Sequence, residues 1–580
     1  MSPQTPESIT FKIKSLLCGL LSVFLIIIVR LTYLQISLSP YFIQKSSQNC
    51  LRIEHALSPR GNIVDRNGAL LATNRPVINV YWQGTGSYFL TQKHHQLLNS
   101  LETIFNKQQT NSLLPNKIIH AELIHAERYY KEKILAKDIS LEQLSKIEES
   151  FPLHPNIRLK TDFQRLYPNT YSAGHILGYL SRSIDNESSG KMGLEKVLEQ
   201  NLKGEPGQWL ATVNSVGRKL AYQEIKAART GKNVETTLDI TLQKICDEVF
   251  PADYEGAMIV MNPLNGDILA LISRPTFDPN LFLSPISTKD WHALQEKKPF
   301  INRAFNMTYP PGSIFKLITL SAALEHNIVT PESECNCRGY ISFGGRNIQC
   351  HQKWGHGKQF LSQALANSCN IICYDIGKKI DIDILAHYAH LFGFGQKTNI
   401  FFEEQQGLVP SRSWKRIAKN EPWWPGETLS VCIGQSFLLV TPIQVAAMIS
   451  SIFTGYLPTP RLLMAESIQK KPLTITQETR NFLKKSMQLV TTAGTGRGAS
   501  IKDYQLYAKT STAQTSALAK RTLDKKYLEH GWFVAYAQYK NSQPLTIVIL
   551  AENSGSSKIA TKIARNFLLR FKELIDLGRL

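Results

Sequence analysis

The most informative residues of the chain form three short motifs whose residue types suit serine acyl transfer. Ser313 is followed three residues later by Lys316. Residues at this spacing share one face of a helix, so we expect the Lys316 amine within hydrogen-bonding reach of the Ser313 hydroxyl, which it can activate as a base. Ser368 and Asn370 form an S-x-N motif, and Lys509 begins the sequence Lys-Thr-Ser. Together these residues predict an enzyme that forms an acyl-enzyme intermediate on Ser313.

The surroundings of the lysines and of the serine favour the same chemistry. Burial and the nearby charge of Lys509 would both lower the pKa of Lys316, which lets its amine accept a proton. A Pro-Pro-Gly sequence at residues 310–312 precedes Ser313 and suits the start of a helix. Free N–H groups at a helix start can stabilise a developing oxyanion, so the Ser313 amide is one expected donor.

The segments around these motifs match one protein family in the same order. They are residues 309–316, 353–357, 433–435, 440–442 and 531–533. On these segments the chain resembles the class B penicillin-binding proteins, and within that class the penicillin-binding protein 2 family of cell-elongation D,D-transpeptidases. The resemblance implies an α+β fold, the penicillin-binding transpeptidase fold, in which an antiparallel sheet is flanked by helices. It also implies an extended N-terminal pedestal domain and one N-terminal transmembrane helix.

The resemblance implies a cross-linking reaction on peptidoglycan stem peptides that end in D-Ala-D-Ala. Ser313 would attack the penultimate carbonyl, Lys316 would take the serine proton, and Ser368 would relay a proton to the departing D-Ala. An amine of a neighbouring stem peptide would then resolve the acyl-enzyme. β-Lactams would inhibit the enzyme by acylating the same serine. No cofactor is expected in this chemistry.

The resemblance also assigns the substrate contacts. Asn370 would bind the peptide amide, Lys509 and Thr510 would bind the substrate carboxylate, and the Thr512 amide would be the second oxyanion donor. Ser511 departs from the family pattern, which is Lys-Thr-Gly. In an ideally alternating strand Lys509 and Ser511 share a face, so the added CH2OH would point toward the substrate and narrow the cleft. We expect an active enzyme with altered affinity for its substrate or for β-lactams.

Three other functions remain as alternatives. A D,D-carboxypeptidase would use water as the acceptor, although the pedestal and the anchor favour a synthase. A β-lactamase would need a deacylating base, and no clear Glu-x-x-x-Asn segment lies between the second and third motifs. A catalytically weak scaffold would only activate a glycan polymerase. The expected partners are stem peptides, β-lactam antibiotics, a polytopic membrane glycan polymerase and other proteins of the elongation complex.

The N-terminal region predicts a membrane anchor at residues 15–36. Residues 15–29 are uncharged and strongly apolar, and the apolar sequence continues after Arg30. About 20 apolar residues span a bilayer, provided that Arg30 extends toward one membrane surface. The alternative is a cleaved signal peptide, but the bulky residues that follow disfavour a cleavage site. Lys12 and Lys14 predict a cytoplasmic tail at residues 1–14, so the rest of the chain is expected on the periplasmic side of the bacterial inner membrane.

The rest of the chain predicts two domains outside the membrane. We assign residues 37–235 to a class B pedestal of the dimerisation type and residues 236–580 to the transpeptidase domain. Residues 59–68 and 190–195 resemble the two signatures of the pedestal, which we interpret as tight turns held by an Arg–Asp pair. Residues 90–160 are polar and helix-like, including the Leu and Ile spacing of residues 134–147, and resemble the head of the pedestal.

The C-terminal half predicts antiparallel strands covered by helices. Residues 257–261 and 268–272 flank an Asn-Gly-Asp turn, and residues 532–537 and 545–550 flank a second polar turn, which are hairpin patterns. Apolar residues recur every fourth position from Ile559 to Ile575 and predict a terminal helix that packs on the sheet. We expect the early and the late strands in one sheet.

The cysteines form a second constellation. Nine cysteines in an exported chain suggest disulfides, but Cys337, Cys350, His356 and Cys369 fall within 33 residues. Three thiolates and an imidazole can form a closed tetrahedral zinc site, and the resemblance supports one, because related proteins can carry a metal beside the Trp-Gly-His segment. A Cys337–Cys350 disulfide is the alternative. Cys369 lies inside the S-x-N motif, so it should point away from the substrate and let a structural zinc support that motif. Two further residues, Cys335 and His351, are competing ligands. The remaining cysteines are isolated thiols that we expect to be buried: Cys18, Cys50, Cys246, Cys373 and Cys432.

The chain is strongly basic. It has 66 Lys and Arg against 46 Asp and Glu, a formal net charge of +20. No dense basic run or base-stacking motif is present, which disfavours nucleic-acid binding. A basic exported protein suits a site beside anionic lipid headgroups and a carboxylate-bearing polymer.

Overall fold

The computed structural model describes residues 6–56, 58–106, 111–112, 117–182, 188–214, 218–284, 286–400, 403–515 and 524–579. The first five residues of the predicted cytoplasmic tail lie outside the described residues. The chain divides into two compact units, each built from several segments. The first unit contains Met1–Pro59, Arg75–Gln164 and Gly204–Gly231, and the second contains Arg60–Asn74, Arg165–Lys203 and Lys232–Leu580. The predicted pedestal, residues 37–235, therefore contributes segments to both units.

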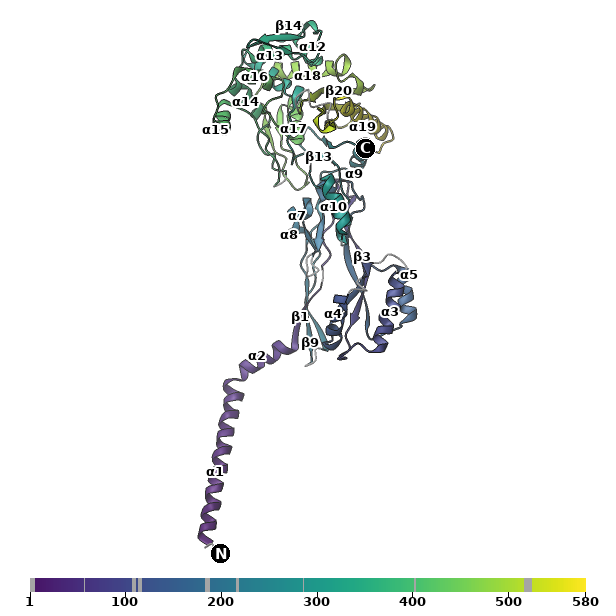
Figure 1. Cartoon of the computed structure of the whole chain (residues 1–580), viewed down its shortest axis with the longest axis vertical. Coiled ribbons are helices and arrows are strands. Elements are labelled where there is room, and N and C mark those ends of the chain that lie inside the picture. The colour runs from purple at the N-terminus through teal and green to yellow at the C-terminus, as the bar shows by residue number, and fades with distance from the viewer. Residues whose placement is uncertain are drawn as a thin grey trace. The chain divides into compact units, whose positions relative to one another are not determined.

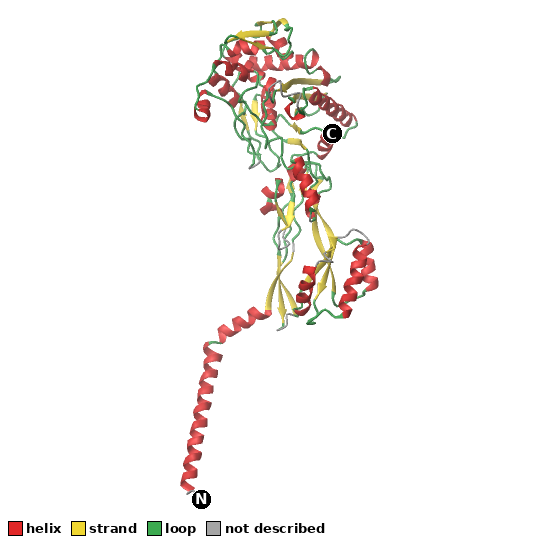
Figure 2. Ribbon diagram, viewed as in Figure 1, coloured by secondary structure: helices red, strands yellow, loops and turns green. Residues whose placement is uncertain are grey.

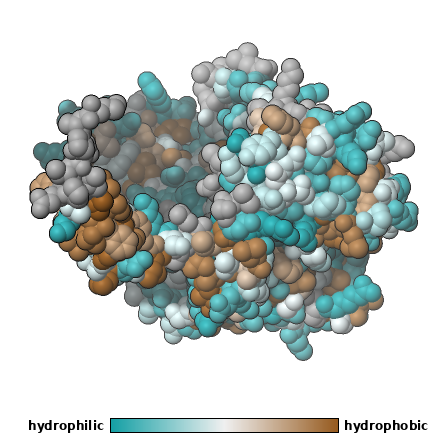
Figure 3. Space-filling view, turned by 90° about the horizontal axis from the view of Figure 1, so that it is seen from below, coloured by the Kyte–Doolittle hydropathy of each residue, from teal (hydrophilic) through white to brown (hydrophobic). Residues whose placement is uncertain are grey.

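The N-terminal segment forms one long apolar helix, α1 (Pro6–Thr32), which continues into the π-helical turn η1 (Tyr33–Ser37) (Figure 1). Within this stretch, Ile13–Ser37 is long and apolar enough to cross a membrane, and its most apolar 18 residues have a mean hydropathy of 2.4. Apolar side chains, brown in Figure 3, gather on this helix. Cys18 is exposed, so the prediction that it is buried is wrong. The reason is that none of the most apolar stretch of this helix is buried within the protein.

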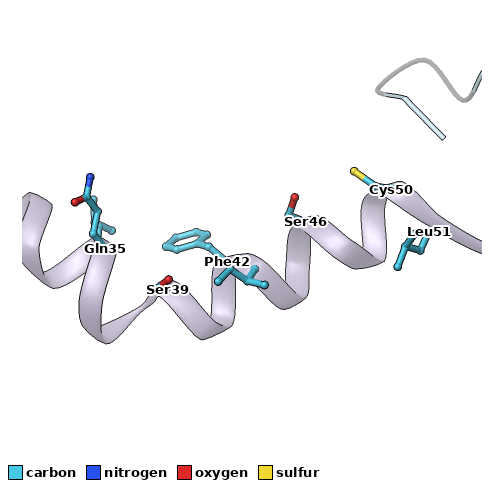
Figure 4. A pocket seen from close by; sticks show the side chains of 8 residues that line it. Gln35, Ser39, Phe42, Ser46, Cys50 and Leu51 are labelled. Atoms are coloured by element: carbon cyan, nitrogen blue, oxygen red, sulfur yellow. The ribbon is translucent and has the colours of Figure 1, made fainter. Parts of the chain in front are cut away.

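Helix α2 (Ser39–Cys50) follows and leads into the first strand. A shallow groove runs along it, and Figure 4 shows Gln35, Phe42 and Cys50 among the side chains that line it. None of the candidate catalytic residues lines this groove. Strands β1 (Leu51–Ala56), β9 (Gly207–Val213) and β10 (Lys219–Lys226) then form a three-stranded antiparallel sheet.

The head of the first unit mixes helices with strands. Its elements are α3 (Gln92–Asn106), β4 (Asn111–Ser112), α4 (Lys117–Arg128), β5 (Glu132–Lys137), α5 (Leu141–Ser150) and β6 (Ile157–Leu166), together with part of β3 (Leu70–Gln83). The helical prediction for residues 90–160 is wrong at residues 134–136, which lie in strand β5 and pair with β3. The strand forms because Leu135 and Ala136 are fully buried in the core that contains Trp82 and Phe105, where sheet pairing satisfies their backbone groups.

The centre of the second unit is a five-stranded antiparallel sheet with the order β13-β12-β22-β21-β20. Its strands are β12 (Gly256–Met261), β13 (Ile268–Arg274), β20 (Tyr504–Ala513), β21 (His530–Tyr539) and β22 (Leu545–Ala551). Strand β12 pairs directly with β22, from Gly256 opposite Ala551 to Met261 opposite Thr546. The two predicted hairpins and the single sheet of early and late strands are therefore confirmed.

Alternate residues of this sheet enter two different cores. Ile259, Val534 and Val548 face one core, whereas Met258 and Phe533 face the other. This follows from the period of two in a strand, and strands buried on both faces read as continuous apolar runs. Helices cover both faces (Figures 1 and 2): α17 (Pro442–Thr454) packs on one, and the predicted terminal helix, α19 (Lys558–Asp576), packs with α9 (Ile240–Val249) on the other.

The remaining elements of the second unit surround this sheet or precede it. The helices are α6 (Gly174–Leu177), α7 (Gly193–Val197), α8 (Glu199–Leu202), η2 (Pro279–Leu283), α10 (Thr288–Lys297), η3 (Gly312–Ile314), α11 (Lys316–Glu325), α12 (Leu361–Ala366), α13 (Ile371–Gly377), α14 (Ile382–Leu391), α15 (Arg412–Lys419), α16 (Pro425–Cys432), α18 (Gln477–Thr492), η4 (Arg497–Ala499) and η6 (Lys525–Tyr527). The strands are β2 (Ile63–Val64), β7 (Leu180–Arg182), β8 (Ser188–Gly190), β11 (Val234–Glu235), β14 (Glu334–Cys337), β15 (Tyr340–Phe343), β16 (Arg346–Gln349), β17 (Gly357–Phe360), β18 (Tyr456–Pro458) and β19 (Lys470–Pro472).

The two signature segments of the pedestal meet in a buried charge cluster, which we call the Glu195 cluster. Glu195 is fully buried and accepts hydrogen bonds from Arg60 at 2.6 Å and from Arg165 at 2.7 Å. Arg60 also donates to Glu199 at 2.7 Å. The predicted Arg–Asp pair is therefore wrong. Asp65 instead accepts from nearby backbone N–H groups in its own turn, and the arginine of the first signature pairs with the glutamate of the second.

Candidate active site

Ser313 lies in the short 3-10 turn η3, immediately before helix α11. The Gly312 N–H donates to the Gly434 carbonyl at 2.9 Å, and the Tyr309 N–H donates to the Val440 carbonyl at 2.8 Å. A Cβ atom on Gly434 would lie 2.1 Å from the Gly312 carbonyl oxygen, so only glycine allows this close approach. The segments 433–435 and 440–442 therefore hold the turn that presents Ser313.

Lys316 is buried, and its amine bonds to the S-x-N motif. Nζ donates to the Ser368 carbonyl at 2.6 Å, to Asn370 Oδ1 at 2.7 Å and to the Cys369 carbonyl at 3.2 Å. The hydrogen bonds that the structure gives this amine all go to residues of this motif. The expected direct hydrogen bond to the Ser313 hydroxyl is not among them. The physical reason is that α11 packs beside α13, which brings the Lys316 amine to the S-x-N motif, so its connection to Ser313 runs through the Ser368 hydroxyl.

The Ser368 hydroxyl connects the serine to both lysines. Its Oγ donates to Ser313 Oγ at 2.8 Å and accepts from Lys316 at 3.3 Å and from Lys509 at 3.1 Å. Ser368 lies between α12 and α13, not inside a helix, and its backbone is left-handed with a φ of 54°. This conformation costs a residue other than glycine roughly 1–3 kcal/mol and is found where geometry serves function.

Lys509 is a fully buried cation on the edge strand β20. Besides Ser368, its amine donates to the Thr510 carbonyl at 2.9 Å. Burial, and then the charge of Lys316, lower the pKa of Lys509 well below its usual value. Burial also lowers the pKa of Lys316, an effect that nearby thiols, first Cys373, partly oppose. Among the described residues neither amine has a carboxylate partner.

The two threonines of the third motif differ in exposure. Thr510 is buried, and its hydroxyl shares a 2.6 Å hydrogen bond with the Thr495 hydroxyl. Thr512 is exposed, and its hydroxyl accepts from the Ser557 N–H at 3.3 Å. Thr495 was not identified from the sequence, because it belongs to no recognisable motif and reaches Thr510 only through the fold.

Ser511 shares the strand face of Lys509, as expected, but its side chain is only 2% exposed. Its Oγ accepts from the Ser313 N–H at 2.8 Å and donates to the Pro311 carbonyl at 2.9 Å. The side chain therefore contacts the turn that presents the nucleophile and does not project into an open cleft.

The four predicted metal ligands come together. The candidate ligand atoms of Cys337, Cys350, His356 and Cys369 all lie within 4.8 Å of one another. His356 Nδ1 is 3.4 Å from Cys337 Sγ and 3.7 Å from Cys350 Sγ. All nine cysteines are free thiols, so Cys337 and Cys350 are not joined in a disulfide here. His351 Nδ1 is also 3.8 Å from Cys350 Sγ.

The donor set fits a structural zinc. Tetrahedral zinc with Zn–S distances of about 2.3 Å and Zn–N distances of about 2.0 Å requires ligand atoms roughly 3.5–3.8 Å apart. The two spacings from His356 Nδ1, 3.4 and 3.7 Å, are close to this range, and all ligand atoms lie within 4.8 Å of one another. The cluster also touches the S-x-N motif directly, because the Asn370 N–H donates to Cys350 Sγ at 3.4 Å. The Cys369 carbonyl accepts from Lys316, as described above.

Two family models match the chain. The model described as the penicillin-binding protein transpeptidase domain matches residues 256–569, and the model described as the penicillin-binding protein dimerisation domain matches residues 55–236. The predicted family and the predicted fold class are therefore confirmed.

Curated relatives are similar over nearly the whole chain. The chain is 29% identical to the peptidoglycan D,D-transpeptidase MrdA of Acinetobacter baumannii, with 94% of this chain and 85% of that protein covered. It is 27% identical to the protein of the same name from Escherichia coli K12, with 97% and 94% covered.

Solved structures give the same answer. The chain is similar to the penicillin-binding protein PBP2 of Helicobacter pylori in a complex with MreC, with a TM-score of 0.77, 28% identity and coverage of 91% of this chain and 99% of that chain. It is also similar to a chain of a peptidoglycan synthase complex that coordinates polymerization and crosslinking, with a TM-score of 0.72, 29% identity and coverage of 96% and 97%.

Proposed function

The chain belongs to the penicillin-binding protein transpeptidase family and is most like penicillin-binding protein 2, and we propose that it cross-links peptidoglycan stem peptides through an acyl-enzyme on Ser313. The observation that carries the proposal is the hydrogen-bonded path from Ser313 through Ser368 to two buried lysines. A serine hydroxyl needs a base within reach to become a nucleophile, and this path supplies one.

In the proposed reaction Ser313 Oγ attacks the penultimate carbonyl carbon, and the carbonyl π electrons move to the oxygen. The two hydroxyl hydrogens first rotate, so that Ser313 donates to Ser368 and Ser368 donates to the neutral Lys316 amine. The Ser313 proton then passes to the Ser368 oxygen as the Ser368 proton passes to that amine. When the tetrahedral intermediate collapses, the proton returns through Ser368 to the nitrogen of the departing D-Ala. The resolving amine of a second stem peptide then attacks the ester and gives one of its protons through Ser368 to Lys316. The bond between the carbonyl carbon and Ser313 Oγ breaks, and that proton returns through Ser368 to Ser313 Oγ.

The remaining polar groups position the substrate. The Lys509 amine suits the terminal carboxylate of the donor peptide, because a bound carboxylate favours the protonated form of the amine, and Thr510 lies beside it. The Asn370 side-chain oxygen accepts from Lys316, so the side-chain NH2 group can donate to the backbone of the peptide. Strand β20 lies at the edge of the sheet, where an extended peptide can add as a further strand.

Labelling with a fluorescent penicillin tests this function. The full-length protein in detergent should label, and Ser313→Ala should fold and not label. The matched control is Ser321→Ala, because Ser321 lies in α11, the helix that follows Ser313, and its hydroxyl donates to the Leu317 carbonyl of that helix. Equal labelling of wild type and Ser313→Ala would contradict the assignment.

We also propose a structural zinc held by Cys337, Cys350, His356 and Cys369. When bound, it would cross-link the segment between β14 and β17 to the S-x-N motif and take no part in the acyl transfer itself. Metal content by mass spectrometry and intact mass with and without reductant test this site. About one zinc per chain with free thiols would support the proposal. A mass deficit of two hydrogens without metal would support the Cys337–Cys350 disulfide instead.

We further propose that α1 anchors the protein in the inner membrane, with the catalytic unit in the periplasm. The apolar stretch Ile13–Ser37 supports a single crossing. The relatives seen with MreC and in a peptidoglycan synthase complex support partners of the elongation complex, including a membrane glycan polymerase. A cysteine-labelling experiment on intact cells tests the orientation: a new cysteine at exposed Leu153 should react with a membrane-impermeant maleimide.

A further inference from the structure

The Ser511 hydroxyl accepts a hydrogen bond from the Ser313 N–H, a backbone donor that acyl transfer needs. Its Oγ accepts the Ser313 N–H at 2.8 Å, and it donates its own proton to the Pro311 carbonyl at 2.9 Å. A Cβ atom on Gly312 would lie 2.4 Å from this Oγ, which shows how closely the hydroxyl is seated against the turn. The two bonds bridge the residues on either side of Gly312 and tie the nucleophile turn to strand β20.

The Ser313 N–H is the group that should stabilise the oxyanion. When Ser313 Oγ bonds to the carbonyl carbon, the negative charge forms on an oxygen held beside this amide. One N–H has one proton, so it cannot fully serve the Ser511 hydroxyl and the oxyanion at the same time. In the structure the amide is already satisfied from within the protein.

We propose that Ser511 is a positioning residue that occupies the oxyanion amide in the resting enzyme and must release it for each acylation, a proposal that rests on the function proposed above. The exchange is feasible because a hydrogen bond to a charged oxygen is stronger than one to a neutral hydroxyl, so the developing oxyanion displaces Ser511. Ser511 then keeps its bond to Pro311 or rotates to another staggered position about χ1. The cost of the exchange slows acylation relative to an enzyme with glycine at this position.

Two substitutions separate the hydrogen bond from the space that the side chain fills. Ser511→Ala removes the hydroxyl and keeps Cβ, whereas Ser511→Gly removes both. Loss of one competing hydrogen bond should raise the second-order acylation rate constant for a penicillin by about 2- to 10-fold in both variants. Ala513→Gly is the matched control, because Ala513 lies two residues along the same strand against the same turn but offers no acceptor. It should not raise the rate.

A boronic acid inhibitor gives a readout that a purely structural role would not move. Its tetrahedral adduct on Ser313 places an oxygen beside the Ser313 amide, so Ser511→Ala should tighten its binding by the same factor that raises the acylation rate. Noncovalent binding of the penicillin before acylation should not change. Thermal unfolding of each variant checks that the fold is retained.

The outcomes distinguish the two proposals. If wild type labels on Ser313 but Ser511→Ala acylates at an unchanged or lower rate, the occupancy proposal is overturned and the transpeptidase assignment stands. If only Ser511→Gly accelerates acylation, the side chain acts through its volume, and the occupancy proposal is again overturned. If neither wild type nor any variant labels, the proposed function fails, and this inference fails with it.

Discussion

Two clusters of buried cations in the second unit show opposite solutions to the same electrostatic problem. In the Glu195 cluster, Arg60 and Arg165 are buried around a carboxylate that both of them contact. In the active site, Lys316 and Lys509 are buried around the Ser368 hydroxyl, and among the described residues no carboxylate pairs with either amine.

The difference separates a structural site from a reactive one. A carboxylate partner keeps a buried cation charged, and the charge then contributes to holding two chain segments together. Without that partner, burial lowers the pKa of Lys316 and Lys509, which prepares an amine to take a proton. The chain therefore uses arginine, which stays protonated, where it needs a fixed charge, and lysine where it needs a proton acceptor.

The largest expected effect is the loss of catalysis without loss of stability in Lys316→Met. General-base catalysis contributes about 10²- to 10⁴-fold, so the acylation rate constant should fall by at least about 10²-fold. Because the substitution removes a buried amine that has no carboxylate partner among the described residues, the melting temperature should stay the same or rise. Stopped-flow acylation and thermal unfolding measure the two effects.

The matched control for Lys316→Met is Lys415→Met. Lys415 is equally buried, but it pairs with Glu427 at 2.5 Å. Its replacement should lower the melting temperature and leave the acylation rate of the folded protein unchanged. If both methionine variants changed stability in the same direction, carboxylate pairing would not be what distinguishes these two lysines.

The second effect is the converse, a loss of stability without loss of catalysis in Glu195→Gln. The variant keeps the side-chain shape but leaves buried Arg165 without a carboxylate partner and Arg60 with Glu199 alone, which should cost about 3–5 kcal/mol of unfolding free energy. Urea unfolding measures this cost, and penicillin labelling of the folded fraction should match wild type. Glu199→Gln is the control: its carboxylate is 28% exposed and contacts one arginine, Arg60, among the described residues, so its loss should cost much less. Equal costs for the two variants would show that burial between two arginines is not what makes Glu195 important.

The smallest expected effect concerns an uncharged contact of the active site. Thr495→Val removes the hydroxyl that bonds to Thr510 at 2.6 Å. One neutral hydrogen bond is worth about 0.5–1.5 kcal/mol, so acylation should slow by roughly 2- to 10-fold. The change should appear in the KM for a carboxylate-bearing thioester substrate, because Thr510 is assigned to the carboxylate. A fall in kcat alone would place Thr495 in the chemical step instead.

Much of the architecture follows from local sequence patterns. The hairpin of β12 and β13, the hairpin of β21 and β22, and the apolar stripe of α19 all have the periodicity that the structure confirms. Residues 134–136 were misassigned because a short apolar run fits either a helix or a strand, and only pairing with β3 decides between them. The membrane-spanning length of Ile13–Ser37 was readable for a similar reason, since it depends on composition alone.

The sequence by itself determined which residues carry the chemistry, because the types and order of Ser313, Lys316, Ser368 and Lys509 are encoded directly. Tertiary structure alone decided how they connect. The packing of α11 beside α13 brings Lys316 to the S-x-N motif, and the left-handed backbone of Ser368 accompanies a hydroxyl that lies between the serine and both lysines. These contacts join residues far apart in the chain, so no local spacing can specify them. The same reason explains why the Ser511 hydroxyl was recognised as unusual from the sequence, while its bond to the Ser313 amide, 198 residues away, emerged only when β20 was packed against the nucleophile turn.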